Sequence, residues 1–219
     1  MHDNDLYVRH QALVALVGVL LHDLRNPLHN ATLLIEAKSL DTEALRAKLR
    51  AQFGKLEALL GEATDAVREM VIEARTEPIE VDKLVHRAIE LASDANCQWS
   101  TGAIPAGLVV AGDMEMLARA VAELATYIAE KARAGMVDSE VPNVRISVEQ
   151  PEPGLVTVRV GDLPATLDET MAKAPFSIAG GGIHLALARA LSQNTGAKMR
   201  LAKAADGTSY FTLTAPAKA

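Results

Sequence analysis

A run of seven residues near the amino terminus carries the densest group of reactive side chains in this sequence, His22-Asp23-Leu24-Arg25-Asn26-Pro27-Leu28. An imidazole nitrogen is a good nucleophile near neutral pH, and an adjacent carboxylate can bind the other ring nitrogen and fix the tautomer. Asn26 follows His22 by one helical turn, where its carboxamide can orient a water molecule. The alternative interpretation is that His22 is an ordinary polar residue on the solvent-exposed face of a helix.

The segment around these residues has the pattern of one long amphipathic helix from about residue 5 to residue 38. Its apolar residues recur every three or four positions, namely Leu13, Val17, Leu20, Leu24, Leu28, Ala31 and Ile35. Leu20 and Leu24 face the apolar seam, which leaves His22 and Asn26 off it. Pro27 removes one backbone hydrogen bond, so we expect a bend just before it. Ser39 to Thr42 then stop the helix, with Asp41 or Ser39 as the cap of the next one.

A second helix follows after this short connection, and its apolar residues form a heptad seam. They are Leu45, Leu49, Phe53, Leu56, Leu60, Ala63, Val67 and Met70. Two long helices with so short a link must lie antiparallel, and a single hairpin cannot bury both apolar stripes. We therefore expect a homodimer in which two hairpins form a four-helix bundle.

After Glu77-Pro78 the long helical periodicity gives way to shorter pieces separated by Gly, Pro and Asp. The pattern predicts helices over about 81–92, 113–134 and 183–193, the middle one capped by Asp113. It predicts strands near 97–100, 108–111, 144–148, 155–160, 198–202 and 209–214, with turns at Pro151–Gly154 and Asp206-Gly207. The expected fold class is α+β: a helical hairpin over residues 1–76, then a two-layer α/β sandwich over residues 77–219.

Composition excludes several classes of function. The 219 residues include 22 Lys and Arg against 28 Asp and Glu, which gives a net charge of −6, and no basic block suggests a nucleic-acid partner. The longest apolar run, from Ala12 to Leu21, is about half of the roughly 20 residues that a membrane helix needs. Cys97 is the only cysteine, so no internal disulfide forms. We expect a cytoplasmic protein without a membrane partner.

The run HDLRNPL resembles the phospho-acceptor box of sensor histidine kinases, whose helical hairpin dimerises and whose following domain binds ATP. The resemblance extends over nearly the whole chain. Residues 78–85 are similar to the segment that opens the catalytic domain of this family, and Ala111-Gly112-Asp113 resembles the lead into its first nucleotide motif. Residues 196–198 and 207–213 resemble its closing hairpin.

This resemblance implies roles for three residues of the acceptor box. His22 is the residue that is phosphorylated, Asp23 is its general base, and Asn26 helps water to attack the phosphoryl group on the partner's aspartate. Arg25 has no such clear role and is as well explained as a solvated basic residue. His29 lies seven residues from His22 with no cysteine or carboxylate to complete a metal site, so we interpret it as a surface histidine and expect no metal site.

The nucleotide motifs depart from the family pattern at several positions. Two asparagines are expected four residues apart, the second holding magnesium, but this chain has Glu123 and Tyr127 there, and a phenol is a poor ligand for a hard cation. Asp162 stands where the family binds the adenine amino group, although it is equally a common turn residue. Pro164 and Thr166 replace glycines that let the loop approach the base.

The third motif is partly retained. Gly180, Gly181 and Gly182 match a glycine-rich loop that opens a helix, where backbone donors favour anions, although three glycines are equally a plain hinge. His184 replaces the last glycine of this loop. The candidate nucleotide-binding residues are therefore Asp162, Gly180 and Gly182, and we expect no cofactor unless the altered pocket still binds ATP and magnesium.

These observations favour a signalling protein that resembles dimeric histidine phosphotransferases. It would exchange a phosphoryl group between His22 and the aspartate of a response-regulator receiver domain, as a phosphotransferase or a phosphatase, with ATP binding lost. Two alternatives stay open: an active cytoplasmic kinase with an altered ATP pocket, and a non-catalytic dimeric scaffold that binds a response regulator.

Overall fold

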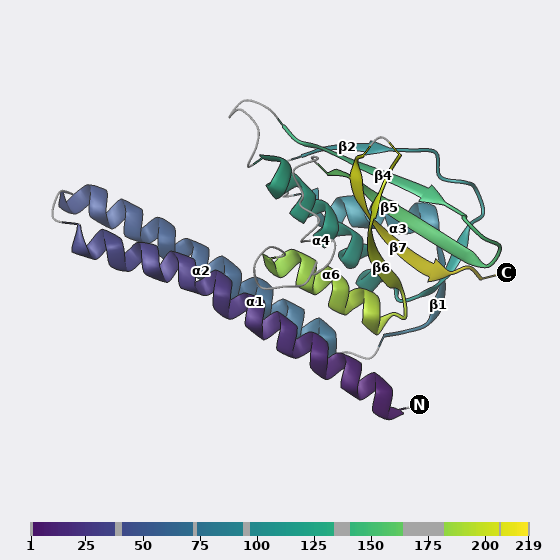
Figure 1. The fold of residues 1–219 in the computed structure, drawn as a ribbon, viewed down its shortest axis with the longest axis horizontal. Helices are drawn as coiled ribbons and strands as arrows, with labels where there is room; N and C mark the ends of the chain where they lie inside the picture. Colours follow the sequence, from purple (N-terminus) through teal and green to yellow (C-terminus); the bar gives the residue numbers. More distant parts are fainter. Residues whose placement is uncertain are drawn as a thin grey trace.

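The structure is a computed structural model that describes residues 2–37, 41–71, 74–93, 97–133, 141–163, 182–205 and 207–218. Two long helices open the chain, α1 over His2–Glu36 and α2 over Thr42–Val71, and they pack along each other as a hairpin (Figure 1). The predicted cap by Asp41 is confirmed: its carboxylate accepts a hydrogen bond from the backbone N–H of Ala44 at 2.9 Å. That bond satisfies one of the donors that a first helical turn leaves unpaired.

Pro27 lies inside α1, and the chain stays helical on both sides of it as far as Glu36. Its ring is buried. A proline at this position removes one backbone hydrogen bond from the helix. The helix continues despite this loss, because its other backbone hydrogen bonds and the packing of the buried ring stabilise it. A bend before Pro27 stays a prediction.

The apolar stripe of α2 divides into two parts. Leu49 and Leu56 are partly buried and Ala63 is 4% exposed, whereas Phe53 and Leu60 are each 50% exposed. On α1, large apolar side chains also face solvent, namely Val14, Val17, Leu21 and Leu28. The single hairpin thus leaves an apolar surface uncovered.

The rest of the chain forms helices and strands in nearly the predicted order. The helices are α3 (Val81–Leu91), α4 (Met114–Arg133) and α6 (Gly182–Asn194). The strands are β1 (Glu77–Glu80), β2 (Gln98–Thr101), β3 (Val109–Gly112), β4 (Asn143–Glu149), β5 (Leu155–Leu163), β6 (Lys198–Lys203) and β7 (Ser209–Pro216).

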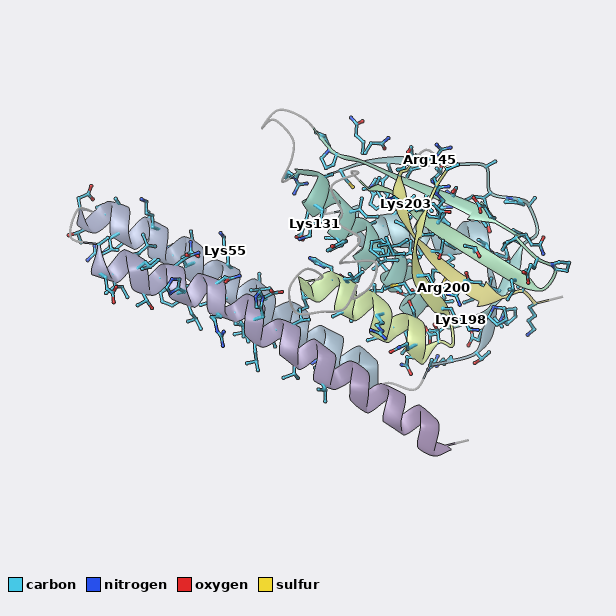
Figure 2. All side chains as sticks on the ribbon, in the orientation of Figure 1. Lys55, Lys131, Arg145, Lys198, Arg200 and Lys203 are labelled. Carbon is cyan, nitrogen blue, oxygen red and sulfur yellow. The ribbon has the colours of Figure 1, made fainter. Side chains whose placement is uncertain are left out.

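Five strands form the main sheet in the order β2-β4-β5-β7-β6. Only β2 runs parallel to its neighbour, β4, and the other pairs are antiparallel. The turn between β4 and β5 uses Gly154 at a φ of 87°, and the turn between β6 and β7 uses Gly207 at 89°, which are conformations that glycine adopts without strain. Along this sheet lie the side chains of Arg145 on β4 and of Lys198, Arg200 and Lys203 on β6 (Figure 2).

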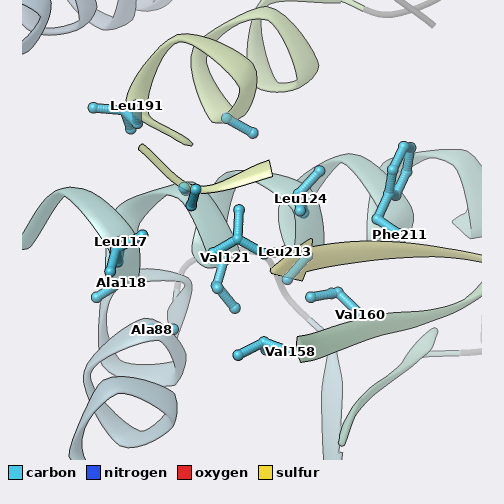
Figure 3. Close-up of a cluster of buried hydrophobic side chains, with 14 of the residues drawn as sticks. Ala88, Leu117, Ala118, Val121, Leu124, Val158, Val160, Leu191, Phe211 and Leu213 are labelled. Carbon is cyan, nitrogen blue, oxygen red and sulfur yellow. The ribbon is translucent and has the colours of Figure 1, made fainter. Parts of the chain in front are cut away.

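The core lies between this sheet and the helices, as the alternation of apolar residues predicts. On β5, Val158 and Val160 are buried, and on β7, Phe211 and Leu213 are buried. They meet Val121 and Leu124 of α4 and Leu191 of α6 (Figure 3). Burying each such side chain contributes about 1.5–3 kcal/mol, so this layer fixes how α4 and α6 lie on the sheet.

Helix α6 lies between α4 and the hairpin (Figure 1). It contacts both α1 and α2, and Val19 of α1 and Ala63 of α2 belong to the same buried apolar cluster as the sandwich. The hairpin and the sandwich therefore pack against each other and share one buried apolar cluster.

The short strand β1 was not predicted, because Glu77-Pro78-Ile79-Glu80 has a single buried residue, Ile79. It pairs antiparallel with β3, a contact between distant segments that its own pattern does not reveal. Among the described helices, none is long and apolar enough to cross a membrane.

Candidate functional site

His22 stands on α1 with 41% of its side chain exposed, beside Asp23 with 24% exposed. Nδ1 of the imidazole lies 3.1 Å from Oδ1 of Asp23. An ionised carboxylate only accepts hydrogen bonds, so the proton of the neutral ring stays on Nδ1 and is donated to Asp23. The lone pair of Nε2 is then the nucleophile that His22 can offer to solvent.

The other polar residues of the acceptor box lie further along the same helix. Asn26 and His29 are both exposed, and helical spacing places them one and two turns beyond His22. Arg25 is also exposed. In the described part of the chain, no group of three or more His, Cys, Asp or Glu side chains gathers as a metal site would require.

A second polar cluster joins α4 to α6. Nδ1 of His184 lies 2.6 Å from Oε2 of Glu123, and Nε2 of His184 lies 3.4 Å from Oε1 of Glu130. Nε of Arg119 donates to the other oxygen of Glu123 at 3.3 Å. Two of the residues at which the sequence departs from the pattern of the family it resembles, Glu123 and His184, are thus direct partners. We call Glu123, Glu130 and His184 the Glu-His-Glu cluster.

The charge of His184 follows from this surrounding. Burial of the ring by itself would lower the pKa of His184, but the hydrogen bonds and charges of Glu123 and Glu130 outweigh it and raise that pKa to about 10. The hydrogen bond from His184 in turn lowers the pKa of Glu130. His184 is therefore an imidazolium at neutral pH, held mainly by Glu123, which is 14% exposed, because Glu130 is 54% exposed and its attraction is screened by water.

Tyr127 faces the core. It is 1% exposed, and its ring meets Phe211 edge-on at 5.9 Å between centroids. Burial, helped by the charge of Glu130, raises the pKa of Tyr127 to about 12. Tyr127, which the resemblance places at the magnesium-binding asparagine of the kinases, is therefore a protonated phenol in the apolar layer.

The remaining nucleotide-motif residues are only partly described. Asp162 belongs to β5, but its side chain lies outside the described residues, as do Gly180, Pro164 and Thr166. Gly182 is the first residue of α6, which agrees with the prediction that the glycine run opens a helix.

Sequence reasoning missed Glu130 and the link from Glu123 to His184. A signal existed, because Glu123 and Glu130 are seven residues apart and so share one face of α4. Sequence spacing gave no sign that α6, 61 residues further along at His184, packs against that face.

Comparison with known proteins rests on structure, because no family model and no curated protein matches this sequence. The chain is similar to the mycobacterial sensor histidine kinase MprB, with a TM-score of 0.51 and 18% identity over 66% of this chain and 99% of that one. It is similar to the Acinetobacter baumannii histidine kinase AdeS, with a TM-score of 0.55 and 17% identity over 89% of this chain and 97% of that one.

A third solved structure, full-length ShkA in complex with AMPPNP, matches 99% of this chain and 46% of that one, with a TM-score of 0.53 and 19% identity. The chain therefore has the fold of the two-component histidine kinases: a helical hairpin followed by an α/β sandwich that resembles their ATPase domain.

Proposed function

We propose that this chain exchanges a phosphoryl group between His22 and the aspartate of a response-regulator receiver domain. The observation that carries the proposal is the half-exposed His22 whose Nδ1 is held by Asp23, on a hairpin with the histidine-kinase fold. In this proposal residues 1–76 carry the transfer, while residues 77–219 serve as a docking surface or a brace that packs on the hairpin through α6.

The transfer needs no proton to move at the attacking atom. The lone pair of Nε2 forms the new N–P bond while the bond from phosphorus to the receiver's aspartyl oxygen breaks, and that carboxylate leaves. The product ring carries a positive charge with its proton on Nδ1, which Asp23 stabilises through the 3.1 Å hydrogen bond. Asn26, one turn along α1, is the residue that would orient water if the receiver is dephosphorylated instead.

We propose that ATP binding is lost, because the described residues of the nucleotide site do not fit magnesium and ATP. A hard cation takes carboxylate, carbonyl or water oxygens, whereas Tyr127 presents a phenol ring packed against Phe211. The carboxylate of Glu123 is already engaged by His184 and Arg119. The imidazolium of His184 also brings a fixed positive charge where a metal ion would have to bind.

We also propose that the hairpin forms a homodimer. The apolar surface of α1 and α2, with Leu21, Phe53 and Leu60 each at least half exposed, is the kind of stripe that a second hairpin covers in a four-helix bundle.

The test is transfer from a phosphorylated receiver domain, taken in turn from the response regulators of the same cell, to the purified chain. We expect acid-labile label on the wild type and none on His22→Ala. Asp23→Asn should slow the transfer about 10- to 100-fold, since the amide cannot stabilise the charged ring as a carboxylate does. His29→Ala, another exposed histidine of α1, is the matched control and should behave as wild type. Transfer to none of the receivers, or undiminished transfer to His22→Ala, would refute the proposal.

Loss of ATP binding has its own test. Incubation with γ-labelled ATP and magnesium should leave both the wild type and His22→Ala unlabelled. Label on the wild type alone would identify an active kinase and contradict the interpretation of Glu123, Tyr127 and His184, while leaving His22 as the acceptor.

A further inference from the structure

One face of the five-stranded sheet is turned away from every helix that packs on it. Helices α4 and α6 contact the sheet on the side of the buried side chains, among them Ile146 and Val158. Because side chains alternate along a strand, the residues between them face outward. We call this surface the outer sheet face. Among the described side chains, its charged residues are Arg145, Glu149, Arg159, Lys198 and Arg200.

The strand register brings these cations into adjacent rows. Arg159 on β5 stands opposite Thr212 on β7, which stands opposite Arg200 on β6. Lys198 begins the next row, opposite Thr214. Arg145 lies on β4 opposite Gly161. With strands about 4.8 Å apart and residues about 3.4 Å apart along each strand, the four cations spread over a patch about 20 Å across at its widest.

The centre of this patch is ordered. The guanidinium of Arg159 lies 3.6 Å from the centroid of the Tyr210 ring. Gly161 makes room beside it, because an added Cβ there would come within 2.7 Å of the Cβ of Tyr210. Arginine and tyrosine are the residue types that dominate binding energy in protein interfaces, and here both are already held in place, which lowers the entropy lost on binding.

Three cations of the face, Arg145, Lys198 and Arg200, have no ionic partner among the described residues. These three side chains take part in none of the ion pairs found among the described residues, and Glu149 is the one carboxylate on the outward-facing positions of β4. Yet the whole chain has a net charge of −6. Positive charge is therefore concentrated on this face of an acidic protein.

Protection of a sheet edge explains only part of this pattern. Lysines on an edge strand such as β6 prevent pairing with other chains, which accounts for Lys198. Arg145 and Arg159 lie on β4 and β5, which have a neighbouring strand on both sides and expose no edge. A role in binding accounts for both groups.

We infer that the outer sheet face is a docking surface for an acidic protein surface. Charges are screened over about 8 Å at physiological salt, so a compact acidic patch that lies directly on this face is attracted by its cations. A long polyanion would extend past the face and be repelled by the acidic remainder of the chain. A membrane is disfavoured because the only apolar surface that the described residues of this face offer for insertion is Ala202 and the ring of Tyr210, which already packs on Arg159, and because the cations are few for lipid attraction.

The outer sheet face lies on the opposite side of the sheet from the helices and the hairpin. The sheet separates it from α4 and α6, and α6 separates the sheet from the hairpin (Figure 1). A partner bound there leaves His22 accessible, so this inference does not depend on the proposed phosphotransfer and fails or holds separately from it.

The test measures binding of a fluorescent octapeptide of alternating Glu and Asp to the full chain by anisotropy, with a Gln and Asn peptide as the neutral probe. Wild type should prefer the acidic peptide, and Arg145→Glu/Arg200→Glu should weaken that binding about tenfold or more. The matched control is Lys55→Glu on α2, an exposed lysine remote from the sheet (Figure 2), which should change it less than twofold.

Equal loss of acidic-peptide binding in Arg145→Glu/Arg200→Glu and in Lys55→Glu would show a general charge effect and overturn the inference. Tighter, Arg145- and Arg200-dependent binding of phosphatidylserine vesicles or of double-stranded DNA would overturn the choice of a protein as the occupant. Circular dichroism checks that each variant is folded, and the single variants Arg145→Glu and Lys198→Glu repeat the measurement if the double variant is not.

Discussion

The Glu-His-Glu cluster places a mostly buried positive charge between two carboxylates. The imidazolium of His184 is 17% exposed and lies 2.6 Å from Glu123. A buried charge without a partner is strongly unfavourable, so each member of such a pair depends on the other. The cluster therefore holds α6 against α4 at the place where the family resemblance implies a nucleotide site.

His184→Gln should destabilise the protein at neutral pH by roughly 3–5 kcal/mol, because it leaves the carboxylate of Glu123 partly buried beside a neutral side chain. The pKa of His184 is raised from its ordinary 6.5 to about 10. The stabilisation by its charge is therefore complete below about pH 6.5 and is lost as the pH rises through 10. The gap in unfolding free energy between wild type and His184→Gln should narrow over that range, by up to about 1.4 kcal/mol per pH unit.

Urea unfolding at several pH values between about 6 and 10 measures this gap. His29→Gln, which replaces an exposed histidine of α1, serves as the control and should follow the wild-type profile. A gap that stayed constant or widened with pH would mean that His184 is not an imidazolium in the folded protein.

At the scale of elements, Asp113 joins the segment after the hairpin to the start of α4. Its Oδ1 accepts from the backbone N–H of Met116 at 3.1 Å, and its Oδ2 accepts from that of Arg75 at 3.0 Å. Asp113→Ala should cost about 1–2 kcal/mol of stability. Asp113→Asn should cost less, because its carbonyl oxygen can still cap Met116. Urea unfolding midpoints rank wild type, Asp113→Asn and Asp113→Ala in stability, and Glu57→Ala on α2 serves as the neutral reference. Equal midpoints for the two Asp113 variants would contradict the capping role.

Two glycines should respond in opposite directions to replacement by alanine. Gly54 lies inside α2, and an added Cβ would have nothing within 4 Å, so Gly54→Ala should stabilise the protein by about 0.5–1 kcal/mol through helix propensity. At Gly161 the Cβ would lie 2.7 Å from the Cβ of Tyr210, so Gly161→Ala should destabilise it by about 1–3 kcal/mol. Thermal unfolding of both variants compares them directly, and a shift of the same sign would count against this account of the outer sheet face.

For the whole molecule, the uncovered apolar stripe of the hairpin predicts self-association. Phe53→Glu/Leu60→Glu places two charges on side chains that are each 50% exposed and should convert a dimer into a monomer, because burying unpaired charge in the bundle is unfavourable. Sedimentation equilibrium at several concentrations reports the mass. Val141→Glu, at a residue that is 44% exposed and precedes β4 in the sandwich, is the matched control and should stay dimeric. A wild-type monomer at all concentrations would refute the homodimer.

The sequence by itself determined the features that depend on near neighbours along the chain. Spacings of three and four gave α1, α2 and α4, alternation gave β4 to β7, and Asp41 and Asp113 marked the helix starts that they cap. The half-exposed setting of His22, off the apolar seam, also followed from helical periodicity. Each of these features is local, because the partners lie within a few residues of one another.

Tertiary structure decided the features that depend on pairing between distant segments. It placed His184 against Glu123 across 61 residues, turned Tyr127 toward Phe211, paired the unpredicted β1 with β3, and gathered the cations of β4, β5 and β6 on one face. The physical reason is that periodicity shows which face of an element is apolar but leaves open which other element will cover it. That choice is made by the packing of the whole core, which brings together residues that no local pattern connects.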